Sequence, residues 1–433
     1  MGSGRSATST PRTWLVIGWI LIFANGPLFF VARRFLDLPG TWEGPVLRPV
    51  IVVAIGTGLG LVLLDGERLG GYHLRPVPLV PFAAAVAFGV WAAITTLWSL
   101  EPDATLWRGL GYACLPFVAW IIADLDSDRW RRALAGGAGI LVVSSLLVVV
   151  ARPEWGTDIN DDWRGVMTNR NGLGPVCGLA VLAGISLLAS NRRRSGGVLV
   201  LLSTLTLLGT GSRTAWFALL LAVGVASFVV VGRTVYVRTP ERRVIAAALV
   251  SALAGAIAFV AAMTVMWGQS TFVQRRRIWD LVGDHISDSP IGGAGWGAFW
   301  YHPELHLDPL LQRGSAHGSI PELLLGGGVV ALGLWLVVVA IAFTGVLRVA
   351  WNEPGADSWL WLAVVVFLLV ENLTESFVLW FSYNWILLIA AALRFGSLRR
   401  GRVQSPTRSA STPKAVSDGS GNTGRERTHE PQR

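Results

Sequence analysis

The residue types best suited to binding an anionic substrate are concentrated between residues 270 and 328. Three consecutive arginines (275–277) precede the glycine-rich segment S-P-I-G-G-A-G-W-G-A-F (289–299), and A-H-G-S-I-P-E-L-L-L-G-G-G (316–328) opens a long apolar run. Guanidinium groups bind phosphate through paired hydrogen bonds, and an imidazole exchanges protons near neutral pH. A basic, histidine-bearing segment between two apolar runs therefore indicates a site for an anionic or lipid-linked substrate.

The arginine cluster lies in F-V-Q-R-R-R-I-W-D (272–280), which predicts a short amphipathic helix on the outer membrane surface. Its apolar side chains suit the membrane interface: Phe272, Val273, Ile278 and Trp279. We expect Arg277, with Arg276 beside it, to contact the substrate. Binding of Arg275 and Arg276 to anionic lipid headgroups is an open alternative.

Two further segments place polar groups where an apolar run begins. T-G-S-R-T-A-W (210–216) puts Arg213 directly after Ser212, a suitable helix N-cap. A tight turn with an arginine reaching for lipid phosphate is the alternative. T-N-R-N-G-L-G (168–174) supplies two amides and an arginine, namely Asn169, Arg170 and Asn171. Their amides either bind sugar hydroxyls or cap the helix, and both interpretations stay open.

His317 is the candidate for proton transfer. It opens an apolar run, four residues before Pro321 and five before Glu322. An imidazole at the membrane edge can take a proton from a sugar hydroxyl or donate to a phosphate, although a lone histidine is more often structural. Glu371 and Glu375 lie at the outer end of another apolar run. Acids at membrane depth are costly, so we expect pairing with an arginine first and general-base work second.

Neither a metal nor a nucleotide is predicted. H-P-E-L-H (302–306) has H-x-E-x-H spacing, not the H-E-x-x-H of zinc proteases, and its proline interrupts a helix. The glycine-rich segment 289–299 follows no strand and precedes no P-loop lysine. We expect it to form a re-entrant or surface-packed loop that carries the site.

Composition dictates the class of fold, because 52% of the 433 residues are hydrophobic and gather in runs long enough to cross a bilayer. The candidate spans are 13–32, 46–64, 77–98, 105–123, 134–151, 171–190, 196–211, 213–231, 244–267, 316–347, 358–373 and 378–395. We predict an all-α integral membrane protein with about twelve transmembrane helices and one large extracytoplasmic loop between spans 9 and 10.

Charge distribution predicts the orientation. Most of the 36 basic residues fall in the N-terminus, in alternate short loops and in the tail, with R-R-R at 192–194 as a strong cytoplasmic marker. Both termini are then cytoplasmic. The predicted organisation is a cytoplasmic segment 1–12, a membrane domain 13–395 with an extracytoplasmic catalytic loop 268–315, and a disordered basic tail 396–433.

In this orientation the even-numbered spans run from outside to inside, so their N-terminal ends point outward. Arg108, Arg170, Arg213 and His317 lie at or just before the ends of spans 4, 6, 8 and 10. Free backbone N–H groups and arginines at several helix ends make an anion site, and a pyrophosphate is the expected occupant.

These residues resemble the O-antigen ligase and polymerase superfamily of bacterial envelope polysaccharide enzymes. The resemblance rests on G-V-M-T-N-R-N-G-L-G (165–174), G-S-R-T-A (211–215), R-I-W-D followed by D-S-P-I-G-G-A-G-W-G-A-F (277–299), the histidine segment 316–328 and N-L-T-E-S-F (372–377). Together they extend over about half of the chain. The family often shows His-Asn where this chain has His317-Gly318, so an asparagine contribution is absent or comes from elsewhere.

The resemblance implies a GT-C-like, metal-independent, inverting glycosyltransferase of the cytoplasmic membrane with an extracytoplasmic active site. Its donor is a glycan on undecaprenyl diphosphate, and its acceptor is a hydroxyl of another glycan or lipid. Arg213 and Arg277 match the arginines that bind the diphosphate, and His317 matches the essential histidine. The expected substrate-binding group comprises Arg108, Asn169, Arg170, Asn171, Arg276, Glu322 and Glu375. Glu322 or Glu375 is the alternative base. No cofactor and no nucleic acid are expected, and membrane lipids are the other partners.

Three alternatives stay open. A polymerase would join lipid-linked repeat units instead of ligating a finished chain. A flippase or transporter for lipid-linked oligosaccharides would place charges through the middle of the membrane and break helices in paired halves. A polyprenol-phosphate-sugar transferase would need an acidic pair in the first outer loop, which has only Asp37 and Glu43, separated by proline and glycine.

Overall fold

The computed structural model describes residues 10–37, 47–63, 76–238, 270–301 and 314–396. These residues form helices and turns, with one isolated bridge between Thr157 and Trp163 and no strand among them. The helices are α1 (Thr10–Phe23), α2 (Gly26–Phe35), α3 (Leu47–Leu63), α4 (Leu79–Ile94), η1 (Thr95–Leu97), α5 (Pro102–Asp124), α6 (Ser127–Ala151), α7 (Pro153–Gly156), α8 (Arg170–Ala189), α9 (Arg193–Thr210), α10 (Arg213–Arg238), α12 (Ser270–Asp288), η2 (Phe299–Tyr301), α13 (Ser319–Asn352), α14 (Ala356–Thr374) and α15 (Tyr383–Phe395). The all-α prediction is confirmed for this part of the chain.

Within the described residues, seven helices are long and apolar enough to cross a membrane, or eight if the bent pair α1–α2 counts as one span. They are α4 with η1, α5, α6, α8, α10, α13 and α14. Helices α3 and α15 are apolar but shorter, and α9 begins with two arginines and carries several Ser, Thr and Gly residues. The predicted span 244–267 lies outside the described residues. The count of twelve and the placement of the loop therefore stay predictions.

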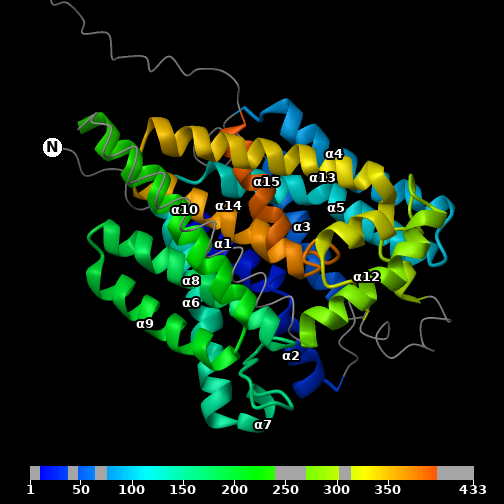
Figure 1. Ribbon diagram of the computed structural model, residues 1–433, viewed down its shortest axis with the longest axis horizontal. Helices are drawn as coiled ribbons and strands as arrows, with labels where there is room; N and C mark the ends of the chain where they lie inside the picture. Colours follow the sequence, from blue (N-terminus) through cyan, green and yellow to red (C-terminus); the bar gives the residue numbers. More distant parts are fainter. Residues whose placement is uncertain (1–9, 38–46, 64–75, 239–269, 302–313, 397–433) are drawn as a thin grey trace, which may run out of the picture. The chain divides into compact units, whose positions relative to one another are not determined.

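Helices α5, α8, α14 and α15 have largely buried side chains. Of these, α14 and α15 lie in the middle of the helical bundle in Figure 1. Helices α4 and α13 pack on the α5–α15 side, whereas α6 and α9 pack on α8, and α10 lies against α8 and α14. Tryptophans fill much of the space between helices. Trp130 stacks on Trp361 with ring centroids 4.3 Å apart, and both rings are fully buried.

Two predicted spans are broken. The span 13–32 is two helices, α1 and α2, bent by 64° at Asn25, which has a left-handed φ of 69°. Gly26 follows directly and packs against Met167, where a Cβ would come within 2.6 Å of the Met167 Cα atom. The bend therefore arises from a close backbone contact with the segment that precedes α8.

The second break is inside α13, at Gly328, whose φ of 64° and ψ of −162° are not helical. The glycine-rich loop docks into this break, since a Cβ on Gly328 would lie 2.0 Å from the carbonyl oxygen of Ile291. Polar groups released by the break find partners: Val329 N donates to Pro290 O at 2.8 Å, and Trp91 Nε1 donates to Gly327 O at 2.8 Å. Such satisfaction is what permits a broken helix at membrane depth.

Two other boundaries differ from the sequence prediction. Helix α13 continues to Asn352 and so extends beyond the end of the predicted span 316–347. The predicted span 378–395 begins with a turn, and its helix starts only at Tyr383. The amphipathic helix expected at 272–280 is present but longer, as α12. The segments H-P-E-L-H, the tail after 396 and residues 1–9 lie outside the described residues.

Candidate active site

The starts of several helices meet at one cavity of about 580 Å³. Side chains from α2, the first half of α5, the entry of α8 and the segment just before α13 line it, together with residues that follow α14. The lining residues are Ala24, Asn25, Phe29, Arg33, Arg108, Met167, Thr168, Asn169, Asn171, Gly172, Gly297, Trp300, Tyr301, Gly314, Ser315, His317, Glu375, Ser376, Phe377 and Trp380. Of the four residues that the charge pattern placed at outward helix ends, Arg108 and His317 line this cavity, whereas Arg170 and Arg213 do not.

A second cavity of about 210 Å³ adjoins the first, because Asn169, Asn171 and His317 line both. Arg170 from the start of α8 and Arg275 from α12 contribute its basic side chains. The structure thereby brings together six of the ten residues that we assigned to catalysis or binding, namely Arg108, Asn169, Arg170, Asn171, His317 and Glu375.

Glu375, directly after α14, joins three elements. Its Oε1 accepts hydrogen bonds from Arg275 at 2.5 Å and from Asn171 Nδ2 at 2.9 Å, and its Oε2 lies 3.7 Å from His317 Nδ1. Only 11% of the Arg275 side chain and 14% of the Glu375 side chain are exposed. A charged pair this far from water requires close, well-directed contacts. The carboxylate is therefore a fixed junction between α12, α8 and the histidine.

His317 has a left-handed backbone with φ 49°, an uncommon conformation for a residue other than glycine. Hydrogen bonds on both sides hold it there. Trp279 Nε1 donates to Ala316 O at 2.8 Å, and Gly318 N donates to Ser376 Oγ at 3.2 Å. Both ring nitrogens are shielded from water and have no hydrogen-bond partner within the described residues. Buried polar atoms usually have a hydrogen-bond partner, so the two ring nitrogens are available to a group that enters the cavity.

Glu322 lies beneath this segment and is buried. Its Oε1 accepts from Ala316 N at 2.5 Å and from Ser376 Oγ at 2.9 Å, and its Oε2 accepts from Trp300 Nε1 at 3.0 Å. All three hydrogen-bond donors to the carboxylate are groups of the protein itself. The arrangement makes Glu322 the anchor of the histidine segment.

Arg108 is almost completely buried, with 3% exposed. Its guanidinium lies between two aromatic rings, 5.6 Å from the Tyr301 centroid and 5.3 Å from the Trp380 centroid, and donates to the Tyr301 hydroxyl at 3.2 Å. Gly297 in the glycine-rich loop makes room, since a Cβ there would come within 1.7 Å of Arg108 Nη1, and its φ is 72°. This geometry ties the loop to α5.

The rim of the larger cavity is electropositive. Partial burial, and next the charge of Arg34, lower the pKa of Arg164, with Arg33 adding a smaller effect against the opposing Asp158. Mutual repulsion of this kind requires the three guanidinium groups to be close together. Of these three arginines, Arg33 lines the cavity itself.

The entry to α8 combines capping with an ion pair. Asn169 Oδ1 accepts from Gly172 N at 2.8 Å, a helix N-cap, which is one of the two interpretations left open for this amide. Arg170 pairs with Asp162. Asp162 in turn lies against Gly211, two residues before Arg213, so the start of α10 is close to this rim.

Three assigned arginines do not line either cavity as the described residues form it. Arg213, Arg276 and Arg277 are exposed, and their assignment stays a prediction. Arg275 is the member of the cluster that points inward. Helical phase could have revealed this, since residues 275, 278 and 282 share one face, and Ile278 and Val282 are fully buried against protein. Ile278 thus does not rest on the membrane interface.

Arg33 was also missed, because it lies directly after the predicted span 13–32 and was not assigned to the site. The bend at Asn25 redirects α2 and brings Arg33 to the cavity instead. The N-G-P segment (25–27) is the feature of the sequence that indicates this bend. Ser376 was likewise not assigned, although it bridges Glu322 and the backbone after the histidine.

Fold and site together define a multi-pass α-helical membrane protein with an arginine- and histidine-lined cavity where helix N-termini converge. The family model described as O-antigen ligase matches residues 198–336, which include Arg213, the arginine cluster and His317. Exopolysaccharide production protein ExoQ of Rhizobium meliloti (strain 1021) is 25% identical over 348 residues, 75% of this chain and 78% of that protein. The resemblance to the O-antigen ligase and polymerase superfamily is confirmed, and it supports a glycan-transfer role in polysaccharide biosynthesis.

Proposed function

We propose that this chain transfers a glycan from an undecaprenyl-diphosphate carrier to an acceptor hydroxyl on the outer face of the cytoplasmic membrane. One observation carries the proposal. His317, with both ring nitrogens unpartnered among the described residues, stands against the Glu375–Arg275 pair in a cavity of about 580 Å³. A base, a carboxylate that positions it, and a rim of guanidinium groups are the parts such a transfer requires.

In the proposed reaction, the acceptor oxygen attacks the anomeric carbon of the donor sugar from the face opposite the diphosphate. The new carbon–oxygen bond forms as the bond to the diphosphate breaks, which inverts the configuration. His317 takes the hydroxyl proton, and the electron pair of the broken bond leaves on the diphosphate. A diphosphate is already a good leaving group, so no nucleotide is needed.

Charge compensation falls to the arginines. The proposal assigns Arg213, Arg276 and Arg277 to the carrier diphosphate from the outer surface, and Arg170 and Arg33 to the rim that it approaches. Helix N-termini at α8 and α13 add partial positive charge in the same region. Each of these groups stabilises negative charge as it develops on the leaving diphosphate.

The geometry favours His317 over the two glutamates as base. Glu375 Oε1 accepts two hydrogen bonds and its Oε2 lies 3.7 Å from His317 Nδ1, whereas Glu322 is held by three hydrogen bonds. We assign Glu375 and Asn171 to positioning. Arg108 organises the aromatic wall formed by Tyr301 and Trp380, so its contribution to diphosphate binding is through the shape of the cavity.

A polymerase uses the same chemistry with a lipid-linked acceptor, and the word exopolysaccharide in the relative's name favours it. The transporter alternative gains one feature, the break in α13, since broken helices line many transport sites. The charged residues that line the two cavities nevertheless lie at or near helix ends, where a bond-forming site is expected.

Deleting the gene and profiling envelope glycans by gel electrophoresis and mass spectrometry tests the proposal. Loss of long chains with accumulation of single lipid-linked repeats would support a polymerase. Accumulation of full-length chains on the carrier would support a ligase. Complementation with His317→Ala should fail in both cases, and an unchanged glycan profile in the deletion strain would refute the proposal.

A further inference from the structure

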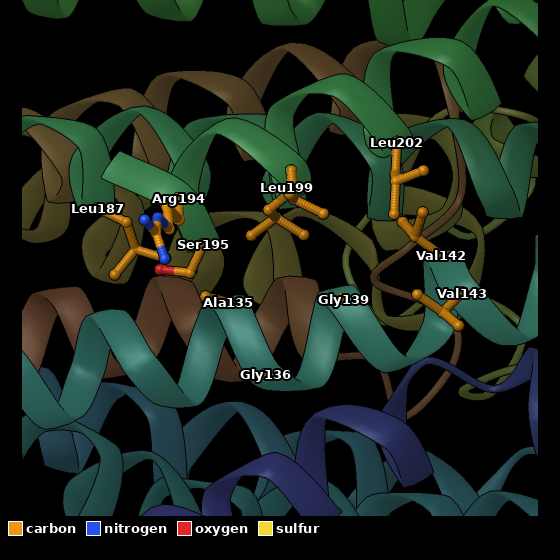
Figure 2. A pocket seen from close by; sticks show the side chains of 11 residues that line it. Ala135, Gly136, Gly139, Val142, Val143, Leu187, Arg194, Ser195, Leu199 and Leu202 are labelled. Atoms are coloured by element: carbon orange, nitrogen blue, oxygen red, sulfur yellow. The ribbon is translucent and has the colours of Figure 1, made fainter. Parts of the chain in front are cut away.

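A second concave feature, at a distance from the active site, lies between α6 and α9. It is an apolar groove of about 500 Å³, and Figure 2 shows side chains of both helices facing it. Its lining residues are Ala135, Gly136, Gly139, Val142, Val143, Leu187, Arg194, Ser195, Val198, Leu199 and Leu202. Arg194 and Ser195 lie at one end, and the remaining lining is apolar or backbone.

The groove exists because α9 packs closely on α8 but not on α6. Gly196 and Gly184 bring α9 and α8 into backbone contact, since a Cβ on Gly196 would lie 2.8 Å from the Gly184 carbonyl oxygen. On the α6 side, a Cβ added to Gly139 would meet Leu199 Cδ1 only at 3.4 Å, an ordinary contact distance. Gly136 and Gly139 on α6 have no side chains to fill this space, so a groove remains between α6 and α9.

The Arg194 end of the groove is strongly basic. Residues 126–132 and 192–194, at the beginnings of α6 and α9, carry six arginines and two aspartates. Asp128 already pairs with Arg132 at 2.9 Å and with Arg192 at 3.3 Å. Arg194 is exposed and forms no ion pair with any described residue. The first backbone N–H groups of α9 add the positive end of its helix dipole.

This end is far from the active site. The opposite end of α9 is attached to the segment before α8, where Trp163 N donates to Gly209 O at 2.9 Å. The 18 residues of α9 span about 27 Å at 1.5 Å per residue, roughly the thickness of the hydrocarbon core. Arg194 therefore lies near the opposite membrane face from the active-site cavity.

We propose that the groove is a binding site for an anionic phospholipid. One acyl chain lies along α6 and α9, and its phosphate is bound by Arg194, Ser195 and the start of α9. Eight residues separate Arg194 from Leu202, so the apolar floor continues for about 12 Å from the charged end. An occupant must combine a flexible apolar chain with a negatively charged end at the membrane surface, and a phospholipid does both.

Native mass spectrometry of the purified full chain tests this proposal, with phosphatidylglycerol or phosphatidylcholine of identical acyl chains added in detergent. We expect the wild type to retain phosphatidylglycerol about tenfold more strongly, because both lipids carry a phosphate but the choline cation of phosphatidylcholine cancels its charge and is repelled by Arg194. Arg194→Gln should reduce that preference to none. Gly139→Phe fills the groove and should abolish retention of both lipids.

Matched controls separate the groove from general lipid contact. Ile140→Phe changes the adjacent, 44% exposed residue of the same helix, and Arg348→Gln removes an exposed arginine from the end of α13. Both should retain phosphatidylglycerol as the wild type does. Leu199→Phe provides a second way to fill the groove if Gly139→Phe fails to fold.

Two outcomes would overturn the proposal. Equal retention of the two lipids by the wild type would show bulk lipid contact only. A change of monomer–dimer ratio in Gly139→Phe without a change in lipid retention would make the groove a contact between two copies of the chain.

Discussion

Variants of the Arg275–Glu375 ion pair should affect the free energy of unfolding and the glycan-transfer activity differently. Removing one partner of a buried ion pair leaves an uncompensated charge and costs about 3–5 kcal/mol, whereas removing both costs less than the sum of the two single losses. With side-chain exposures of 11% and 14%, this pair belongs to the buried class. Arg275→Met and Glu375→Gln should each lower the free energy of unfolding by about 3 kcal/mol.

The double variant Arg275→Met/Glu375→Gln distinguishes coupling from simple addition. Two independent losses would lower the free energy of unfolding by about 6 kcal/mol, whereas a coupling of about 3 kcal/mol leaves the double variant as stable as either single one. Denaturant unfolding in detergent measures this cycle. Arg277→Met, an exposed neighbour on α12, should change stability by less than about 0.5 kcal/mol.

Activity should behave differently, because the carboxylate also positions His317. The double variant should regain stability relative to the additive expectation but should not regain glycan transfer in complemented cells. Additive losses in the unfolding cycle would refute the proposed coupling, and full transfer by the double variant would refute the positioning role.

Three further changes probe the supports of the site. Ser376→Ala removes a donor to a buried carboxylate and should lower the free energy of unfolding by about 1–3 kcal/mol, with a parallel loss of transfer; wild-type unfolding would contradict this network. Gly297→Ala forces a Cβ against a buried guanidinium at a φ of 72° and should cost about 1–3 kcal/mol, whereas Gly283→Ala in open space on α12 should be neutral or slightly stabilising in the same unfolding assay. Asn171→Asp sets a second negative charge against Glu375 and should reduce transfer at least about tenfold at constant expression; retained activity would remove Asn171 from the site.

The sequence predicted the helical class well because bilayer-crossing runs are a strong signal that requires no tertiary information. Alternate helices share their direction, which predicts that polar residues at the starts of separate runs meet, and the structure brings some of them together but leaves Arg213 outside the lining of both cavities. Arg108, Asn171 and His317 line one cavity for this reason.

The breaks at Asn25 and Gly328 were not predictable in the same way. Both depend on contacts with distant segments, one with Met167 and the other with Ile291 of the glycine-rich loop. Hydrophobic runs continue through both breaks, so hydropathy alone gives a single span in each case.

The residue types and spacing in the arginine cluster (275–277) identified the segment that forms part of the site. They did not show which of the three arginines points toward the cavity. Arg275 faces the cavity because Ile278 and Val282 turn that side of α12 toward the protein, against Phe299 and Leu325. The apolar face was visible in the sequence, but whether it met lipid or protein was decided by the loop that packs beneath it.

We propose that a glycosidic bond forms at a cavity that binds the carrier diphosphate. One reconstituted reaction tests this most directly. The purified chain would be supplied with lipid-linked glycans extracted from a deletion strain, and release of free polyprenyl diphosphate would be measured by mass spectrometry. The account predicts release together with lengthened or transferred glycan, and neither product with His317→Ala. Movement of intact lipid-linked glycan across the bilayer without any release would contradict it.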